Sequence, residues 1–175
     1  RCTWVKCPAY GGKPMEAGGF ARILAAYKRG VPFIVEQVDA MLVALGAKPG
    51  QLEVLQNTLG RTGSRQIETL YIAGLMKEWT LELMEAIKGG DSEYFRTPAT
   101  ETGEGTGFWE APRGALYHSE KITNNNIDGY QIIIPSTWNL APTNADGVHG
   151  PMEQALIGCP VNDIDMPINA PRTVH

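Results

Sequence analysis

The sequence predicts an α+β fold, in which a helix-rich bundle is followed by a small antiparallel hairpin or sheet. Apolar residues recur at helical spacing over residues 64–88, and the second half carries two strand-like segments on either side of an asparagine run. The chain has 175 residues, 43% of them hydrophobic, and shows no internal repeat. It can therefore bury a core, and we expect one domain over residues 1–175.

The helices are expected in the first half of the chain, after an extended or looped segment over residues 1–20 that is rich in glycine. Pro32 suits the first turn of a helix, and the glycine pair after Lys88 suits a helix end. The apolar stripe that includes Trp79 predicts packing in the core of a helix bundle. The expected helices span residues 20–28, 32–45 and 64–88, with a short helical turn within residues 51–59.

The second half is expected to be mostly extended or irregular. Residues 91–107 are rich in Thr, Gly, Glu and Pro and predict a connector. Strands are expected at residues 117–123 and 128–135, joined at the asparagine run 124–126. In the irregular last part of the chain, one short helix is expected near residues 151–156.

Composition excludes several classes of partner. The formal net charge of −4 gives no indication of a nucleic-acid partner. No run of 18 apolar residues suggests a membrane span, and the first residues lack the apolar region of a signal peptide. Any attachment to a membrane is therefore expected to come through a partner protein.

Two proline-framed polar residues are the main candidates for a functional site. Pro112 and Gly114 flank Arg113 and predict a stiff, narrow turn that aims the guanidinium, which is suited to hold an anionic ligand. Pro135 precedes Ser136 in the same way. The alternative for an isolated Ala-Pro-Arg-Gly segment is a surface loop with a solvated arginine.

The three cysteines, Cys2, Cys7 and Cys159, contain no C-x-x-C pair and do not predict a metal site by themselves. They are expected to be buried or half-buried structural thiols.

Several segments resemble the large subunit of nickel–iron hydrogenases, in the order in which that family carries them. The opening segment resembles the family pattern W-[IV]-K-x-P-x-[YF]-x-G-K-P-M-E-x-G-x-x-A-R. The matching residues are Trp4-Val5-Lys6, Pro8, Tyr10, Gly12 to Glu16, Ala21-Arg22, Gly60-Arg61-Thr62, Ala111 to His118, Pro135 to Asn139, Gly150-Pro151 with Glu153, and Arg172 to His175.

The resemblance covers nearly the whole chain but only the C-terminal portion of a large subunit. In the family, four cysteines hold nickel and iron, two in an R-x-C-x-x-C motif and two in a D-P-C-x-x-C-x-x-H motif. Neither motif is in this sequence, and in relatives the segment matching Arg172 to His175 leads directly into the second one. The resemblance therefore implies a piece of a large subunit without the cysteine ligands of the Ni–Fe centre.

The resemblance also implies a chemistry, the reversible heterolytic cleavage of dihydrogen to protons and electrons. The iron of the family carries two cyanides and one carbon monoxide. Arg113 would donate to one cyanide and act on dihydrogen, either as the base or by electrostatic positioning, and Ser136 would donate to the other cyanide. Pro112 and Pro135 would pack around these ligands, and the backbone carbonyl of Ile132 matches a magnesium ligand.

The implied partners are the remainder of the large subunit and a small subunit that carries iron–sulfur clusters. The implied location is periplasmic or membrane-associated through the partner, with the cytoplasm as the alternative. Two alternatives to a hydrogenase stay open, namely the related metal-free quinone-site subunit of respiratory complex I and a non-catalytic fragment. His118 and Glu16 are expected to be structural rather than catalytic.

Overall fold

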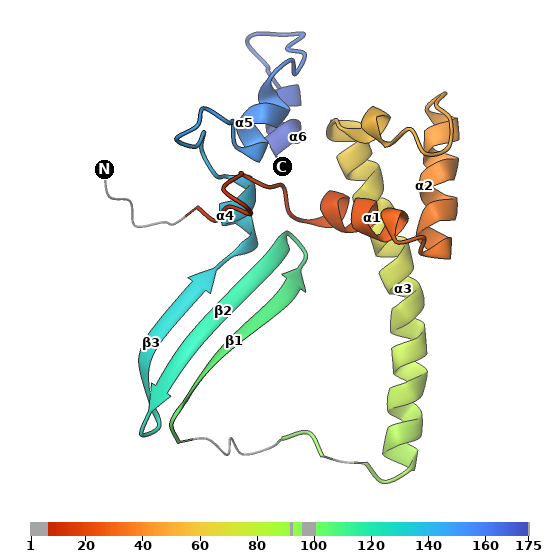
Figure 1. Cartoon of the computed structure of the whole chain (residues 1–175). Coiled ribbons are helices and arrows are strands. Elements are labelled where there is room, and N and C mark those ends of the chain that lie inside the picture. The colour runs from red at the N-terminus through yellow and green to blue at the C-terminus, as the bar shows by residue number, and fades with distance from the viewer. Residues whose placement is uncertain (1–6, 92, 96–100, 175) are drawn as a thin grey trace.

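The computed structural model describes residues 7–91, 93–95 and 101–174 and confirms the α+β fold (Figure 1). Cys2, the Trp4-Val5-Lys6 segment and His175 lie outside the described residues. The elements are α1 (Gly19–Lys28), α2 (Pro32–Ala44), the 3-10 helix η1 (Leu52–Leu55), α3 (Thr58–Lys88), β1 (Gly103–Ala111), β2 (Gly114–Thr123), β3 (Asn126–Ile133), α4 (Pro135–Asn139), α5 (Pro151–Leu156) and α6 (Asn169–Val174).

The core lies where α1, α2 and η1 pack on the N-terminal part of α3 (Figure 1). Pro32 occupies the first turn of α2, as its fixed φ predicts. Val38, Leu42 and Leu55 are completely buried at the centre of this cluster. Apolar burial of this kind supplies most of the stability of a small helical unit.

The beginning of α3 differs from the expectation, because the helix starts at Thr58 and not at residue 64. Asn57 caps it, since its side-chain oxygen accepts a hydrogen bond from the backbone N–H of Gly60 at 2.9 Å. Gly60 also allows the helix to approach η1 closely, because a Cβ there would lie 2.0 Å from the carbonyl oxygen of Leu55. Close packing requires glycine at this position, and because glycine is a poor helix former, the apolar periodicity did not indicate this helix start.

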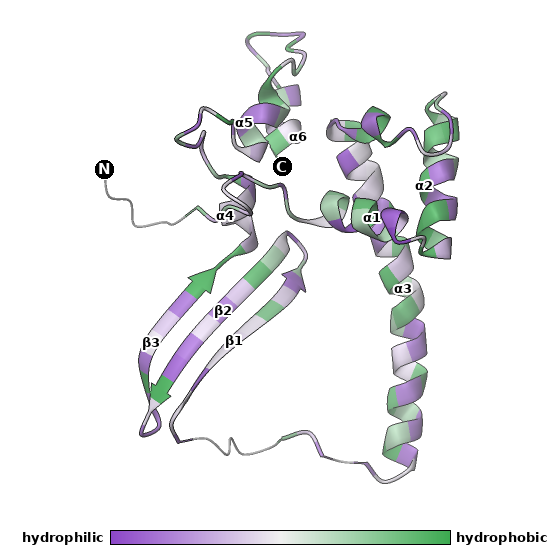
Figure 2. Ribbon diagram, viewed as in Figure 1, coloured by the Kyte–Doolittle hydropathy of each residue, from purple (hydrophilic) through white to green (hydrophobic). Residues whose placement is uncertain are grey.

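The second half of α3 does not pack in the core of the described chain, so the expectation for Trp79 was wrong here. Trp79 is 54% exposed, and Leu83 and Ile87 are also exposed. Figure 2 shows apolar residues along this part of the helix, which projects beyond α1 and α2. The physical reason is length, because a helix of 31 residues spans roughly 46 Å at about 1.5 Å per residue and the two short helices reach only its beginning.

The sheet has three antiparallel strands in the order β1-β2-β3, where only a two-stranded hairpin was expected. The missed strand, β1, pairs with β2 without a register shift from Gly103 opposite Ile122 to Ala111 opposite Gly114. Glycines at positions 103, 105 and 107 weaken the strand signal of this segment. The expected asparagine turn is confirmed, since Asn124 and Asn125 have φ of 49° and 59° between β2 and β3.

The C-terminal part places three short helices above the sheet and near the start of α3 (Figure 1). The short helix expected near residues 151–156 is confirmed as α5, whereas α6 was not expected. Thr58 and Thr173 join α6 to the start of α3 through a hydrogen bond of 2.8 Å between their hydroxyl oxygens. Segments distant in the sequence therefore meet at the N-terminal end of α3.

No helix among the described residues is both long enough and apolar enough to cross a membrane.

Candidate functional site

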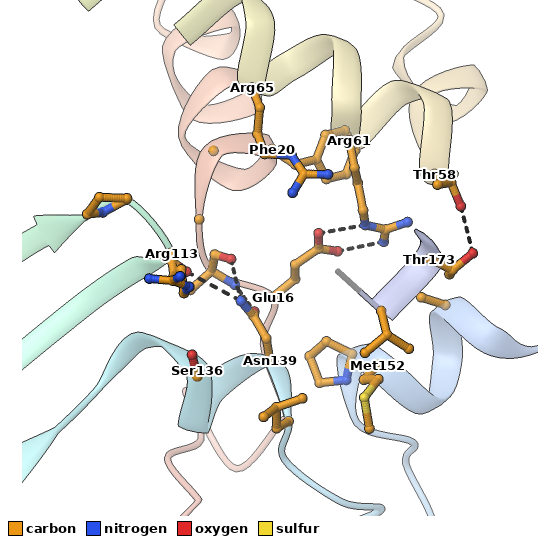
Figure 3. A pocket seen from close by; sticks show the side chains of 18 of the residues that line it. Glu16, Phe20, Thr58, Arg61, Arg65, Arg113, Ser136, Asn139, Met152 and Thr173 are labelled. Atoms are coloured by element: carbon orange, nitrogen blue, oxygen red, sulfur yellow. Dashed lines mark hydrogen bonds and ion pairs between the residues drawn. The ribbon is translucent and has the colours of Figure 1, made fainter. Parts of the chain in front are cut away.

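A cavity of about 580 Å³ lies where the segment before α1, the start of α3, the β1–β2 turn and the three C-terminal helices meet (Figure 3). Its lining includes the two candidates Arg113 and Ser136, together with Pro112. The other lining residues are Glu16 to Phe20, Thr58, Arg61, Arg65, Asn139, Leu140, Pro151, Met152, Ala155 and Arg172 to Val174.

Arg113 lies at the tip of the hairpin that joins β1 to β2. Ala111 pairs with Gly114, so Pro112 and Arg113 form a two-residue turn, which confirms the expected narrow turn. Gly114 has a φ of 128°, a conformation that only glycine adopts readily, and it is buried. The fold thus presents an exposed arginine side chain on a buried, tightly packed base.

Ser136 lies in the first turn of α4, directly after β3. Pro135 begins this helix, with Ile134 in an extended conformation before it. Ser136 is half-buried, and Figure 3 shows it on the same side of the cavity as Arg113. Two turns that are distant in the sequence therefore bring their polar side chains to one cavity, as the proline-framed segments suggested.

Two candidates lie outside the lining of this cavity. Pro135 is adjacent to a lining residue but does not itself line the cavity. Ile132 is on β3, and its carbonyl oxygen accepts a hydrogen bond of 3.0 Å from the side-chain amide of Gln131. The roles of Pro135 and Ile132 stay predictions.

Two of the lining residues, Glu16 in the segment before α1 and Arg61 on α3, are paired with each other. The carboxylate oxygens of Glu16 accept two hydrogen bonds from the Arg61 guanidinium, at 2.8 and 2.7 Å. The guanidinium also lies 5.3 Å from the ring centroid of Phe20. The hydrogen bonds from Arg61 to Glu16 raise the pKa of Arg61, so its guanidinium stays charged throughout the physiological range.

The arginines of the cavity differ in how their charge is balanced. Arg61 is paired with Glu16, whereas within the described part of the chain neither Arg113 nor Arg172 has an ion-pair partner. The lining therefore has positive charge available at the β1–β2 turn and at α6. An unpaired guanidinium at a cavity wall favours anionic ligands.

Among the described residues, no group of three or more His, Cys, Asp or Glu side chains is placed to hold a metal ion. Cys7 is exposed, contrary to expectation, because the segment before the Tyr10–Lys13 bridge lies on the surface. Cys159 is half-buried as expected, with its Sγ 3.3 Å from the hydroxyl of Thr173. His118 is hydrogen-bonded to the hydroxyl of Tyr130, which agrees with the structural role expected for it.

The local sequence patterns missed Arg61, Asn139 and Thr173 as cavity residues. Each lies in one of the segments that carry the resemblance to a known family, namely Gly60-Arg61-Thr62, Pro135 to Asn139 and Arg172 to His175. That shared placement was the signal that could have identified them.

The family described as "Nickel-dependent hydrogenase" matches residues 1–175. The Hydrogenase-1 large chain of Escherichia coli K12 is 39% identical over 181 residues, covering 100% of this chain and 30% of the relative. The uptake hydrogenase large subunit of Afipia carboxidovorans is 34% identical over 183 residues, covering 99% of this chain and 30% of the relative.

Solved structures agree with these sequence matches. The Ni-Fe-Se hydrogenase of Desulfovibrio vulgaris Hildenborough in the reduced state has a TM-score of 0.76 and 33% identity, covering 97% of this chain and 35% of the solved chain. The H2-activated [NiFeSe] hydrogenase of Dm. baculatum has a TM-score of 0.71 and 31% identity. The chain spans about a third of the length of these relatives, and it belongs to the nickel-dependent hydrogenase family.

Proposed function

We propose that this chain forms one wall of the active site of a nickel–iron hydrogenase large subunit, which cleaves dihydrogen reversibly to protons and electrons. The observation that carries the proposal is that Arg113 and Ser136 line one cavity together with the motif residues Glu16, Arg61 and Arg172. The family's R-T-[VI]-H segment leads into its cysteine motif, and Arg172 to Val174 line the cavity here. A centre held by those cysteines would thus adjoin this wall.

The residues present fit the iron ligands that the family implies. Cyanide is anionic and needs hydrogen-bond donors when it is removed from water, because an unpaired buried charge is costly. Arg113 supplies a guanidinium without a carboxylate partner in the described chain, and Ser136 supplies a hydroxyl. Pro112 adds an apolar surface beside them.

When bound, the Ni–Fe centre supplies the redox chemistry that splits dihydrogen. The part of Arg113 is to hold one cyanide and to present positive charge beside the reacting position. An arginine side chain stays protonated under ordinary conditions, so it acts as a fixed donor more readily than as a base. Ser136, in the first turn of α4, would hold the second cyanide.

Ile132 is proposed as a magnesium ligand through its backbone carbonyl. Magnesium prefers oxygen ligands, and a carbonyl oxygen has two lone pairs. The Gln131 amide donates a hydrogen bond of 3.0 Å to this oxygen. Pro135, next to Ser136, is proposed to pack against the iron ligands.

The proposed partners are the rest of the large subunit and a small subunit that carries the iron–sulfur clusters. The exposed apolar side chains of α3, such as Trp79, Leu83 and Ile87, support the view that other parts of the large subunit cover this helix. We propose a periplasmic location, with membrane association through the partner. The relatives reported above are hydrogenases, which favours this function over a quinone-site subunit of complex I or a non-catalytic fragment.

The test is Arg113→Lys in the complete enzyme, because lysine keeps the positive charge but loses the planar set of donors. Turnover per bound nickel is expected to fall by at least about 100-fold, as on loss of one preorganised donor. Arg29→Lys is the matched control, since Arg29 is exposed at the end of α1. Near-normal hydrogen oxidation by a metal-replete Arg113→Lys enzyme would contradict the proposed role.

A further inference from the structure

We propose that Arg22 and Asn139 are positioning residues that together fix the turn carrying Arg113, an inference that rests on the proposed function of Arg113. The backbone carbonyls of three consecutive residues, Ala111, Pro112 and Arg113, all accept hydrogen bonds from these two side chains. The donors come from different elements, Arg22 from α1 and Asn139 from α4. We call this arrangement the turn clamp.

The Arg22 half of the clamp uses all five donors of the guanidinium. Two bind the carboxylate of Glu68 on α3, with Nη2 at 2.9 Å from Oε2, and one binds Glu110 on β1 at 2.7 Å. The other two bind the carbonyl oxygens of Ala111 at 2.9 Å and Pro112 at 3.1 Å. A planar group satisfied at every N–H has one orientation, so Arg22 ties α1, α3 and the turn in a single geometry.

The carboxylates of Glu68 and Glu110 also balance the positive charge of Arg22. Hydrogen bonds from Arg22 to Glu68, and then to Glu110, raise the pKa of Arg22. Its positive charge is therefore committed to these two partners and does not compete with Arg113 for an anion. This pairing suits a positioning residue rather than a second anion-binding group.

The Asn139 half of the clamp joins the other side of the turn to the segment before α1. Its amide oxygen accepts from the backbone N–H of Ala17 at 2.8 Å, and its amide nitrogen donates to the carbonyl of Ala17 at 2.9 Å. The same nitrogen lies 3.4 Å from the carbonyl oxygen of Arg113 (Figure 3). Gly18 allows the turn to lie close to the segment before α1, because a Cβ at position 18 would lie 3.0 Å from the carbonyl oxygen of Arg113.

The clamp matters because the tip of a two-residue hairpin has no sheet neighbour beyond it. Pro112 and Arg113 are exposed, so their own burial does not hold them. A guanidinium acts on a ligand only when its position is fixed closely, and a misplacement of about 1 Å can cost about 100-fold in rate. Arg22 and Asn139 supply that precision through their hydrogen bonds to the backbone of the turn.

The experiment uses the complete enzyme with Arg22→Lys and Asn139→Asp. Lysine cannot make five hydrogen bonds, and aspartate retains the acceptor for Ala17 but loses both donated bonds. The matched controls are Arg29→Lys and Asn126→Asp, the second of which removes a similar amide-to-carbonyl bond of 2.9 Å at the β2–β3 turn. Turnover per bound nickel, the KM for hydrogen and the infrared bands of the cyanide ligands are measured for each.

Both clamp variants are expected to lower turnover per nickel about 10- to 100-fold and to shift a cyanide band, with little change in KM. In an Arg113→Lys background, each clamp variant should add almost no further loss, because the clamp acts through Arg113. A purely structural role would lower nickel content or thermal stability without moving the bands of the loaded enzyme. If Arg22→Lys fails to assemble, Asn139→Asp alone decides the question.

Native bands and turnover in the clamp variants, or losses that multiply with that of Arg113→Lys, would overturn the clamp while leaving the role of Arg113 intact. An Arg113→Lys enzyme with native turnover would instead remove the proposed function and the clamp together. The two failures are therefore distinguishable.

Discussion

Gly114→Ala tests how closely the Arg113 turn must be held. A Cβ at position 114 would lie 2.7 Å from the Cβ of Ala17 and 2.7 Å from the backbone nitrogen of Gly18. Ordinary contact begins at 3.4 Å, so the turn would have to retreat by 3.4 − 2.7 = 0.7 Å. Because residue 113 is bonded directly to residue 114, this shift moves the base of Arg113.

Two costs follow from the substitution. The φ of 128° at Gly114 strains any other residue, by about 1–3 kcal/mol. Overpacking against Ala17 and Gly18 adds roughly 1–3 kcal/mol. A displacement approaching 1 Å at a positioning element is expected to lower turnover by about 100-fold.

The assay is hydrogen oxidation per bound nickel in the complete enzyme, with thermal inactivation measured in parallel. Gly147→Ala is the matched control, because Gly147 has a φ of 78° and nothing within 4 Å of its added Cβ. The control isolates backbone strain from contact with the neighbouring segment. Equal activity and equal stability in the two variants would refute the reasoning, since the contact at position 114 would then have no effect.

Two further changes probe other parts of the site. Ser136→Ala removes one hydroxyl donor, and a buried cyanide that loses this partner costs on the order of 1–3 kcal/mol. The infrared cyanide bands of the assembled enzyme should therefore shift while the fold stays stable. Unshifted bands would mean that Ser136 faces elsewhere. Hydrogen bonds from the Thr143 hydroxyl and the Gly150 N–H lower the pKa of Glu153 below 4.5. The stabilisation is therefore present above pH 4.5 and is lost as the pH falls through the lowered value. Amide-exchange protection of α5 should fall over that range in the native enzyme and stay level in Glu153→Gln, and the same pH dependence in both would contradict this assignment.

The parts of the fold that could be predicted from sequence depend on neighbouring residues. Pro32 at a first turn and the asparagines at a hairpin act through their own backbone angles, so α2 and the β2–β3 turn agree with expectation. The apolar periodicity missed the start of α3, and the local pattern missed the strand β1, because glycines give both segments a weak local signal. Gly60 is in the helix because of its contact with Leu55, a residue outside the helix.

The same distinction between local and distant contacts applies to the residues of the site. The narrow turn at Arg113 follows from its flanking residues, and the resemblance joined it to Ser136. Arg22 and Asn139 have no local pattern that indicates a role, since their hydrogen bonds reach residues 90 and 122 positions away. Trp79 is a case in which a clear local pattern was not sufficient. A regular apolar stripe predicts burial but does not indicate which partner covers it, and Trp79 is exposed here.

The arginines around the cavity perform two different tasks: some join structural elements, and others remain available to bind an anion. Glu68 and Glu110 occupy Arg22, and Glu16 occupies Arg61, so these cations hold elements together and add little net charge. Arg113 is held by its backbone instead, through carbonyl oxygens, and its guanidinium stays available for an anion. Loss of Glu16 would leave the guanidinium of Arg61 unpaired as well, in addition to those of Arg113 and Arg172. An anionic ligand would then also be attracted to the start of α3, so the pairing of the structural arginines restricts the available positive charge to the β1–β2 turn and α6.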